Sequence, residues 1–254
     1  MPVYSFALKI GGVDVTTYGV IVSDLPNNWD APAISYPEVQ IPGRRGTVRT
    51  SAKRQYAPTD YVVKGNLIGT SPSDFESKRD ALHLATLGDA VLIGGNQTAR
   101  QRTGSVTSIQ YPQLYPSAAQ APILITVHCE DPIAYATSAT TVTGSSGSDL
   151  ACAVGSEDSF PVVTATSPTS PLVITYKNHA GTTIATATIT FPGSPATIVV
   201  DMLLQRVTAA GVRHDEYLTA GDFFALSPVD AVGGSPTVRI SSGSASIVYT
   251  QAFR

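Results

Sequence analysis

The alternation of apolar and polar residues along the chain predicts that most of it is β-structure. Apolar side chains recur at every second position through Tyr4–Ile10 and again through Tyr61–Leu67, and a period of two places them on one face of a strand. Gly11–Gly12 follows the first of these segments and predicts a hairpin turn. Ile123–Cys129 is instead a continuous apolar run, which is typical of a buried strand.

One segment has the periodicity of a helix. Phe75 and Leu82 fall on one face at helical spacing, as expected for a helix that packs on a core. Ser73 is followed three residues later by Glu76, the arrangement of a capping box, in which each side chain bonds the other residue's backbone N–H. We therefore expect one substantial helix, near Asp74–Leu87, in an otherwise β protein.

A polar stretch divides the chain into two parts. Thr137–Ser148 consists almost entirely of Ser, Thr and Gly, a composition too polar and too flexible to build a core. We expect residues 1–136 to form an N-terminal β domain with one α-helix and a hairpin, residues 137–150 to be a linker, and residues 151–254 to form a second domain. In that last part, turn residues recur about every 8–12 residues, as in a β-sandwich.

Charge is scarce and unevenly spread. Charged residues make up 14% of the 254, against roughly 25% in an average globular chain, which is expected when much of the surface meets other protein. Residues 1–136 hold 11 basic and 11 acidic side chains, whereas residues 137–254 hold 5 and 8. The net charge of −3 does not indicate affinity for nucleic acid. No apolar run approaches the roughly 20 residues that span a bilayer, so no membrane insertion is expected.

The most distinctive charged feature is Arg44–Arg54, which we call the basic segment. Five positive charges and no acidic residue fall within these eleven positions. The segment could contact a partner, either an acidic protein surface or nucleic acid, or it could be a solvated loop between strands. No aromatic residue alternates with the basic ones, which argues against binding of single-stranded nucleic acid. The chain's single Trp lies in a nearby loop, where it could be a local anchor or an interface residue. The candidate subunit or partner interface residues are Trp29, Arg44, Arg45, Arg49, Lys53 and Arg54.

Known catalytic motifs are absent from the sequence, so we expect neither an enzyme nor a cofactor or metal. No glycine-rich phosphate loop, HExxH or CxxC motif occurs, and these are common signatures of such sites. His128–Asp131 brings four reactive residue types together, but neighbours on a strand point to opposite faces, so His128 and Cys129 cannot act as base and nucleophile for each other. His214–Glu216 has the residue types of a metal site, although a loop tip is more often solvated. Asp201 ends an apolar strand and is expected to form a turn.

A carbohydrate-binding module is the main alternative function, because β-sandwiches often serve that role. Sugar sites commonly use an exposed aromatic ring as a stacking platform. Residues 151–254 contain no Trp, and Tyr176 and Tyr217 are the remaining candidate platforms. Both tyrosines also fit structural roles, so the sequence does not favour this alternative.

Several short motifs follow one another in order along nearly the whole chain. They are the N-terminal strand with its Gly-Gly hairpin, Ile41–Gly46, the capped helix followed by Val91–Ile93, the closing strand followed by Asp131–Tyr135, Val199–Asp201, Gly221–Pro228 and Ser246–Thr250. In their order and spacing these motifs resemble the distal tail protein (Dit) family of long-tailed, non-contractile bacteriophages.

The resemblance implies a structural protein of the virion tail tip rather than an enzyme. In that family the first domain forms a hexameric ring that continues the tail tube, and the second is a galectin-like β-sandwich on the outside. The ring joins the tail tube protein to the baseplate hub and to tail-fibre or receptor-binding proteins, and DNA is only passing cargo in its channel. The resemblance also implies location in the virion tail, after assembly in the cytoplasm of the bacterial host. Likeness of fold to galectins does not carry sugar binding, or adhesion to the host surface, with it.

Overall fold

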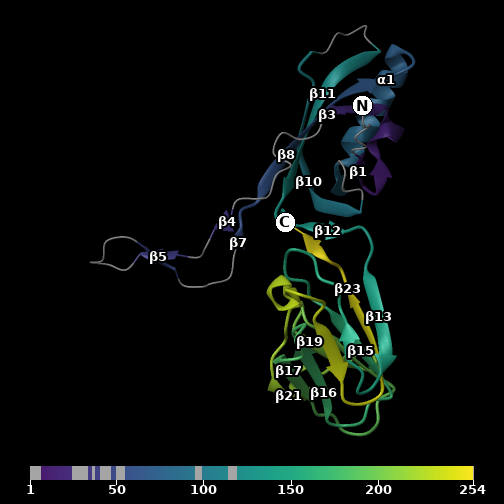
Figure 1. The fold of residues 1–254 in the computed structure, drawn as a ribbon. Coiled ribbons are helices and arrows are strands. Elements are labelled where there is room, and N and C mark those ends of the chain that lie inside the picture. Colours follow the sequence, from purple (N-terminus) through teal and green to yellow (C-terminus); the bar gives the residue numbers. More distant parts are fainter. Residues whose placement is uncertain are drawn as a thin grey trace. The chain divides into compact units, whose positions relative to one another are not determined.

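The computed structural model describes residues 7–24, 34–35, 38–40, 47–49, 55–94, 99–113 and 119–253. Over these residues the chain is mainly β-structure with one α-helix. It divides into two compact units, the first ending at Thr137 and the second running from Ser138 to Phe253 (Figure 1). No helix in the described part of the chain is both long and apolar enough to cross a membrane.

The first unit is built on an antiparallel sheet with the strand order β2-β1-β9-β10-β11-β8-β3, and β12 pairs with the start of β10. Its strands are β1 (Ala7–Ile10), β2 (Val13–Asp14), β3 (Val20–Asp24), β8 (Thr59–Ile68), β9 (Asp89–Ile93), β10 (Arg100–Gln110), β11 (Gln120–Cys129) and β12 (Ala134–Ala136). The strands expected from Tyr61–Leu67 and Ile123–Cys129 are therefore neighbours, paired along the full length of β8. Residues 1–6, where the first expected strand starts, lie outside the described residues.

One face of this sheet packs against the helix α1 (Pro72–Ala85) and the short 3-10 helix η1 (Val15–Tyr18). Phe75 and Leu82 of α1 are 2% and 0% exposed and share a core with Val63 and Ile125 of the central strands. Because strand residues alternate between faces, these inward residues leave a second set on the opposite face of the sheet.

The N-cap of the helix lies two residues before the one expected from the sequence. Ser71, not Ser73, is the N-cap, and its hydroxyl accepts a hydrogen bond from the backbone N–H of Asp74 at 3.2 Å. The carboxylate of Asp74 in turn accepts from the backbone N–H and the hydroxyl of Thr70, at 2.7 and 3.0 Å. The expected box of Ser73 and Glu76 is therefore wrong, because the cap is Ser71 and the side chain of Asp74 bonds Thr70, just before that cap.

Between β3 and β8 the chain forms two short antiparallel pairs in nested order. β4 (Ile34–Ser35) pairs with β7 (Gln55–Tyr56), and β5 (Glu38–Gln40) pairs with β6 (Thr47–Arg49). Nested pairing of this kind is that of a two-stranded ribbon, and β4, β5 and β7 are labelled in Figure 1. Of the basic segment, the structure describes only residues 47–49, which form β6.

The second unit is a β-sandwich of two antiparallel sheets, ordered β13-β23-β15-β18-β19-β20 and β14-β22-β16-β17-β21. The first sheet contains β13 (Thr140–Ser145), β15 (Val162–Thr166), β18 (Thr197–Asp201), β19 (Arg206–Ala209), β20 (Val212–Arg213) and β23 (Ser244–Tyr249). The second contains β14 (Leu150–Ala151), β16 (Leu172–Lys177), β17 (Thr183–Ile189), β21 (Leu218–Gly221) and β22 (Thr237–Ile240). The remaining elements are η2 (Asp215–Tyr217), η3 (Pro228–Ala231) and β24 (Ala252–Phe253). The expected fold class, a β domain with one helix followed by a β-sandwich, is confirmed.

The core of the sandwich follows from the alternation along its strands. Val163, Ile198 and Ile247 of one sheet and Ile174 and Ile189 of the other are all 0% exposed and belong to a single cluster. Each sheet therefore buries one face against the other, and no helix is needed to cover either.

The expected linker is part of the sandwich. Thr140–Ser145 forms β13, which pairs with β23 from Thr140 opposite Tyr249 to Ser145 opposite Ser244. Leu150 is buried in the sandwich core as part of β14. Composition suggested a flexible linker, but Thr and Val are also favourable in strands, and pairing with β23 decides the outcome.

Candidate interface site

The interface residues expected from the sequence fall mostly outside the described part of the chain. Trp29, Arg44, Arg45, Lys53 and Arg54 lie there, so their roles stay predictions. The sixth, at position 49, is the last residue of β6 and lies opposite position 38 of β5 in the strand register. The sites that the structure describes are therefore on the sheets themselves.

The first unit has a sheet face that α1 does not cover, which we call the outer face. Along β8, Asp60, Val62, Lys64 and Asn66 are exposed, while the residues between them are buried. On β11 the matching alternate residues are half-buried. This face is thus open to solvent along β8 and carries a mixture of charged, polar and β-branched side chains.

A row of polar side chains crosses four strands of the outer face. Asp89 of β9 lies opposite Ser105 of β10, Ser105 lies opposite His128 of β11, and His128 lies opposite Asp60 of β8. Directly opposed residues have Cβ atoms about 4.5–5.5 Å apart. His128 Nδ1 and Asp60 Oδ1 are 2.7 Å apart and form a hydrogen bond.

A shallow hollow of about 330 Å³ opens over this row. It is lined by Asp89, Thr103, Gly104, Ser105, His128, Glu130 and Asp131. The carboxylate of Asp131 accepts hydrogen bonds from the hydroxyl of Tyr135 at 2.6 Å and from the backbone N–H of Ile133 at 3.1 Å. Within the described residues, the side chains of Asp89 and Glu130 have no hydrogen-bond or ion-pair partner. The hollow is therefore acidic, with two of its carboxylates uncompensated.

The row does not have the geometry of a catalytic triad. Ser105, His128 and Asp60 are the residue types of a nucleophile, a base and an orienting acid, and they lie in that order. A triad, however, requires the nucleophile to be hydrogen-bonded to the base. No hydrogen bond joins Ser105 to His128 in the described structure, so the row is better explained as a polar surface.

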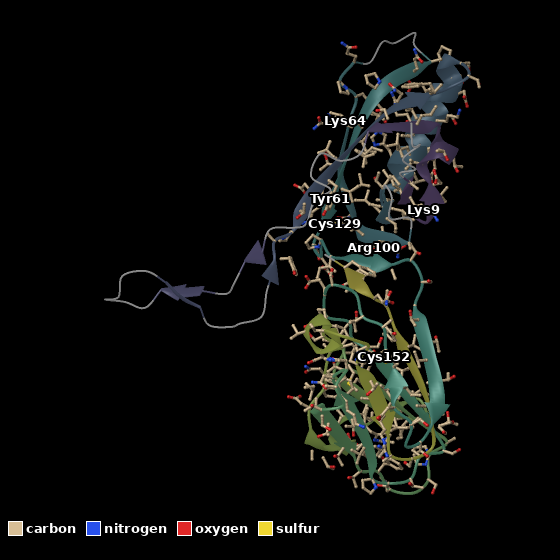
Figure 2. The ribbon with its side chains drawn as sticks, in the orientation of Figure 1. Lys9, Tyr61, Lys64, Arg100, Cys129 and Cys152 are labelled. Atoms are coloured by element: carbon tan, nitrogen blue, oxygen red, sulfur yellow. The ribbon has the colours of Figure 1, made fainter. Side chains whose placement is uncertain are left out.

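Beneath the hollow, the inner face of the same strands is tightly packed. Cys129 is 0% exposed and lies near Tyr61 of β8 (Figure 2). Burial raises the pKa of the Cys129 thiol to about 11, so it stays protonated at neutral pH. Arg102 is 4% exposed, with its Nε donating to the carbonyl of Pro132 at 3.0 Å and its guanidinium 5.6 Å from the Tyr61 ring centre. As expected, His128 and Cys129 face opposite sides of the sheet.

The candidate metal residues of the second unit pair with their neighbours instead. His214 Nδ1 lies 2.8 Å from Glu216 Oε1, and this hydrogen bond lowers the pKa of Glu216. Asp215 accepts hydrogen bonds from Arg213 and from the backbone N–H of Val207, and the Arg213 bond is the main reason that the pKa of Asp215 is lowered. Within the described residues, no cluster of three or more His, Cys, Asp or Glu side chains could hold a metal ion.

The tyrosines considered as sugar platforms have structural positions. Tyr176 is 1% exposed, and its hydroxyl donates to Asp230 at 2.9 Å and accepts from the backbone N–H of Ser227 at 3.0 Å. Tyr176 as a platform is therefore wrong. Tyr217 is half-buried, and its ring stacks on that of His214 with 4.4 Å between the ring centres.

Asp201 forms the turn expected of it. Its Oδ1 accepts hydrogen bonds from the backbone N–H groups of Leu203 and Leu204, at 3.0 and 2.9 Å. The turn holds these two leucines 65% and 58% exposed at the end of the β18–β19 hairpin. It is an apolar protrusion on the surface of the sandwich.

Comparison with known proteins adds information through structure alone. No family model and no curated protein matches the sequence. The crystal structure of the Dit (gp 19.1) protein of phage SPP1, described as a paradigm of the hub adsorption apparatus in phages that infect Gram-positive bacteria, does match. It aligns with a TM-score of 0.72 at 15% identity, over 98% of this chain and 100% of that chain. This chain has the Dit fold.

Two further solved structures match this chain at lower TM-scores. The phage P2 baseplate in its activated conformation matches with Ca and with Sr, at TM-scores of 0.52 and 0.54 and identities of 11% and 10%. Each match covers 97% of this chain and 98% of the matched chain. The resemblance expected from the order of motifs is thus confirmed for the fold, over both units, while residue roles do not transfer at such low identity.

The outer-face hollow could not be predicted from the sequence. Asp60 and His128 are 68 residues apart, and Asp89 is distant from both. Only the pairing of β8, β9, β10 and β11 brings them into one row. Glu130 and Asp131 were visible in the sequence within His128–Asp131, but the side chains beside them on the neighbouring strands were not.

Proposed function

We propose that this chain is a structural hub protein of a phage tail tip. The observation that carries the proposal is the match to SPP1 Dit, which spans 98% of this chain and 100% of that one. Because the alignment covers nearly all residues of both chains, it supports a shared architecture of the whole chain rather than one shared domain. The proposed role is architectural and requires no catalytic group, cofactor or metal.

The hub would be a ring of six copies. In this proposal residues 1–136 make the subunit contacts and line the channel, and the sandwich faces outward. A ring of identical subunits uses heterologous contacts, in which two different surfaces of each copy meet. The outer face and the ribbon between β3 and β8 supply two such different surfaces. The low share of charged residues, 14%, supports a chain whose surface is largely shared with other proteins.

The partners in this proposal are the tail tube protein on one side and the baseplate hub with tail-fibre or receptor-binding proteins on the other. DNA would pass through the ring as cargo. The protein would be located in the virion tail, after assembly in the host cytoplasm. Arg44, Arg45, Arg49, Lys53, Arg54 and Trp29 are the proposed contact residues, because the basic segment has no acidic residue of its own.

Assembly tests the proposal directly. Native mass spectrometry and negative-stain microscopy of concentrated protein, alone and with the tail tube protein, should show rings of six. The double change Arg44→Glu with Arg45→Glu should weaken assembly, while the monomer stays folded.

The matched control is Arg239→Glu, whose effect on ring assembly is compared with that of the single change Arg45→Glu. Arg239 is an exposed residue of β22 in the second unit, so its reversal changes net charge equally without touching the first unit. Protein that stays monomeric alone and also fails to associate with the tail tube protein would contradict the hub. Rings that persist in the double variant would remove the basic segment from the interface.

A further inference from the structure

We propose that β13 of the second unit pairs with β13 of a second copy of the chain, edge to edge and antiparallel, about a two-fold axis. β13 is the last strand of its sheet and is bonded on one side only, to β23 (Figure 1). The contact is distinct from the proposed ring, because a ring uses heterologous contacts whereas a two-fold contact joins identical surfaces. It uses residues of the second unit alone, so it does not depend on the ring.

The register between β13 and β23 shows which residues of β13 are bonded within the chain. The backbone N–H of Ser146 donates to the carbonyl of Gly243 at 2.9 Å, and this pair continues the register of the two strands. Bonded and non-bonded positions alternate along an antiparallel pair. The residues of β13 that are bonded to β23 are therefore Thr140, Val142 and Gly144.

The open edge of β13 consists of the backbone groups of the residues between these. The N–H and C=O groups of Thr141 and Thr143 point away from β23, because each strand residue directs both groups to one side. In the second unit, which the structure describes from Ser138 to Phe253, no other strand pairs with β13. Two donors and two acceptors are thus available to a strand from outside.

This edge has none of the features that usually protect an exposed strand edge. Natural edge strands are kept short or carry charges, prolines or bulges. β13 has six residues in unbroken register with β23, and residues 133–148 include no proline and no charged residue. The other edges of the sandwich are protected, since β14 and β20 have two residues each and β21 pairs with β17 through a register shift. β13 is therefore the edge that is suited to pairing.

The chemistry of the edge specifies its occupant. Only another strand matches donors and acceptors that alternate at the strand spacing. That strand should be uncharged, because residues 133–148 offer no counter-charge. It should be apolar on the inner face, because Val142 is half-buried and packs on the sandwich core, and polar on the outer face, where Thr141 and Thr143 are exposed. β13 itself has all of these properties, so a second copy supplies the matching strand.

Antiparallel pairing centred on Val142 satisfies the whole open edge. Thr141 of each copy then lies opposite Thr143 of the other, and each of these two pairs exchanges two backbone hydrogen bonds. The two Val142 residues face each other across the axis as a non-hydrogen-bonded pair, with Cα atoms about 4.5 Å apart. Cross-strand Thr–Thr and β-branched pairs stabilise a sheet. The contact therefore joins the six-stranded sheets of two copies into one continuous sheet.

A disulfide across the two-fold axis provides the signal for a test in the full chain. Val142→Cys places two thiols at the centre of the pair, where Cα atoms about 4.5 Å apart are within the range of a disulfide. Mild oxidation should give covalent dimers on a non-reducing gel, while the native Cys129 and Cys152, both 0% exposed, contribute little. The matched control is Ile184→Cys on β17, 49% exposed in the same unit. It should give roughly tenfold less dimer, because its thiols meet only by collision. Equal yields from the two variants would overturn the inference.

A proline on the open edge tests whether the backbone makes the contact. Thr143→Pro, added to Val142→Cys, removes an outward N–H and leaves the bonds to β23 in place, and proline is tolerated on an edge strand whose N–H faces solvent. Thr143→Val is the matched control, since it keeps the N–H and removes only the hydroxyl. We expect proline to lower the dimer yield roughly tenfold or more, because two of the four backbone bonds are lost, and valine to leave it unchanged. Equal dimer yields from folded proline and valine variants would show that β13 is not the contact.

Hydrogen exchange tests the contact in the unmodified protein. The amides of Thr141 and Thr143 should exchange more slowly at high protein concentration than at low, because only the pairing of two copies protects them. The amide of Val142, bonded to β23, should be protected at both concentrations. Rings made by the first unit alone would leave Thr141 and Thr143 unprotected, so the result is independent of the proposed function. Fast exchange of these two amides at every concentration would overturn the inference.

Discussion

The sandwich of the second unit buries each of its sheets against the other, whereas the sheet of the first unit has a helix on one face and solvent on the other. In the second unit Ile174 and Val163 come from opposite sheets and are both 0% exposed. In the first, Leu82 of α1 is 0% exposed, while Val62 on the outer face is 37% exposed. The same alternation along the strands thus buries one face of each main sheet, against a second sheet in one unit and against a helix in the other.

The two units differ in what they offer a partner. In the second unit the exposed apolar residues Leu203 and Leu204 protrude from the loop between β18 and β19. In the first unit the sheet face opposite α1 is a broad surface of fixed geometry. That outer face also holds Asp89 and Glu130, with which no described residue pairs. The predictions below test this difference through the free energy of unfolding of core, hydrogen-bond and cap variants.

The largest expected effect is from the core of the first unit. Leu82→Ala should lower the free energy of unfolding by about 2–5 kcal/mol, because it leaves a cavity where α1 packs on the sheet. Urea denaturation followed by circular dichroism would measure it. Leu84→Ala on the same helix is the control, since Leu84 is 70% exposed, and should cost less than about 0.5 kcal/mol. A similar loss of unfolding free energy at both positions would mean that α1 does not pack on the sheet through one face only.

A smaller effect is expected from a buried polar group of the sandwich. Tyr176→Phe removes the hydroxyl that bonds Asp230 and the backbone N–H of Ser227. Unfolding free energy should fall by about 1–3 kcal/mol, because both partners lose a bond at a part-buried site. Tyr217→Phe is the control, since no described residue is hydrogen-bonded to its hydroxyl. Equal stability of the two variants would show that the bonds of Tyr176 do not hold the loop before η3.

The smallest effect concerns the start of α1. Ser71→Ala should cost about 1 kcal/mol, because the Asp74 backbone N–H loses its acceptor. Ser73→Ala should cost less than about 0.5 kcal/mol, because Ser73 is an exposed residue of the first turn. Denaturation midpoints of the two variants, compared side by side, decide between the structural cap and the one expected from the sequence. A larger loss of stability in Ser73→Ala than in Ser71→Ala would instead support the capping box of Ser73 and Glu76.

The sequence predicted well what depends on neighbouring residues. The strands, the single helix and the mainly β class follow from periods that can be read within one segment. The cap was misplaced because Ser71 and Ser73 are equally good acceptors, and the deciding bond between Thr70 and Asp74 is a side-chain contact. The linker was wrong because the partner that orders it, β23, comes about a hundred residues later. The hollow was invisible for the same reason, since its row is assembled from four separate strands.

The two cysteines give each unit a chemical reporter of its own opening. Cys129 belongs to the first unit and Cys152 to the second, and both are free thiols that are 0% exposed (Figure 2). Burial raises the pKa of the two thiols to about 11 and about 12, so neither reacts while its unit is closed. The rate at which each thiol is alkylated therefore records how often its own unit opens. Peptide mapping after a labelling pulse would separate the two rates in the unmodified protein, with no dye or mutation.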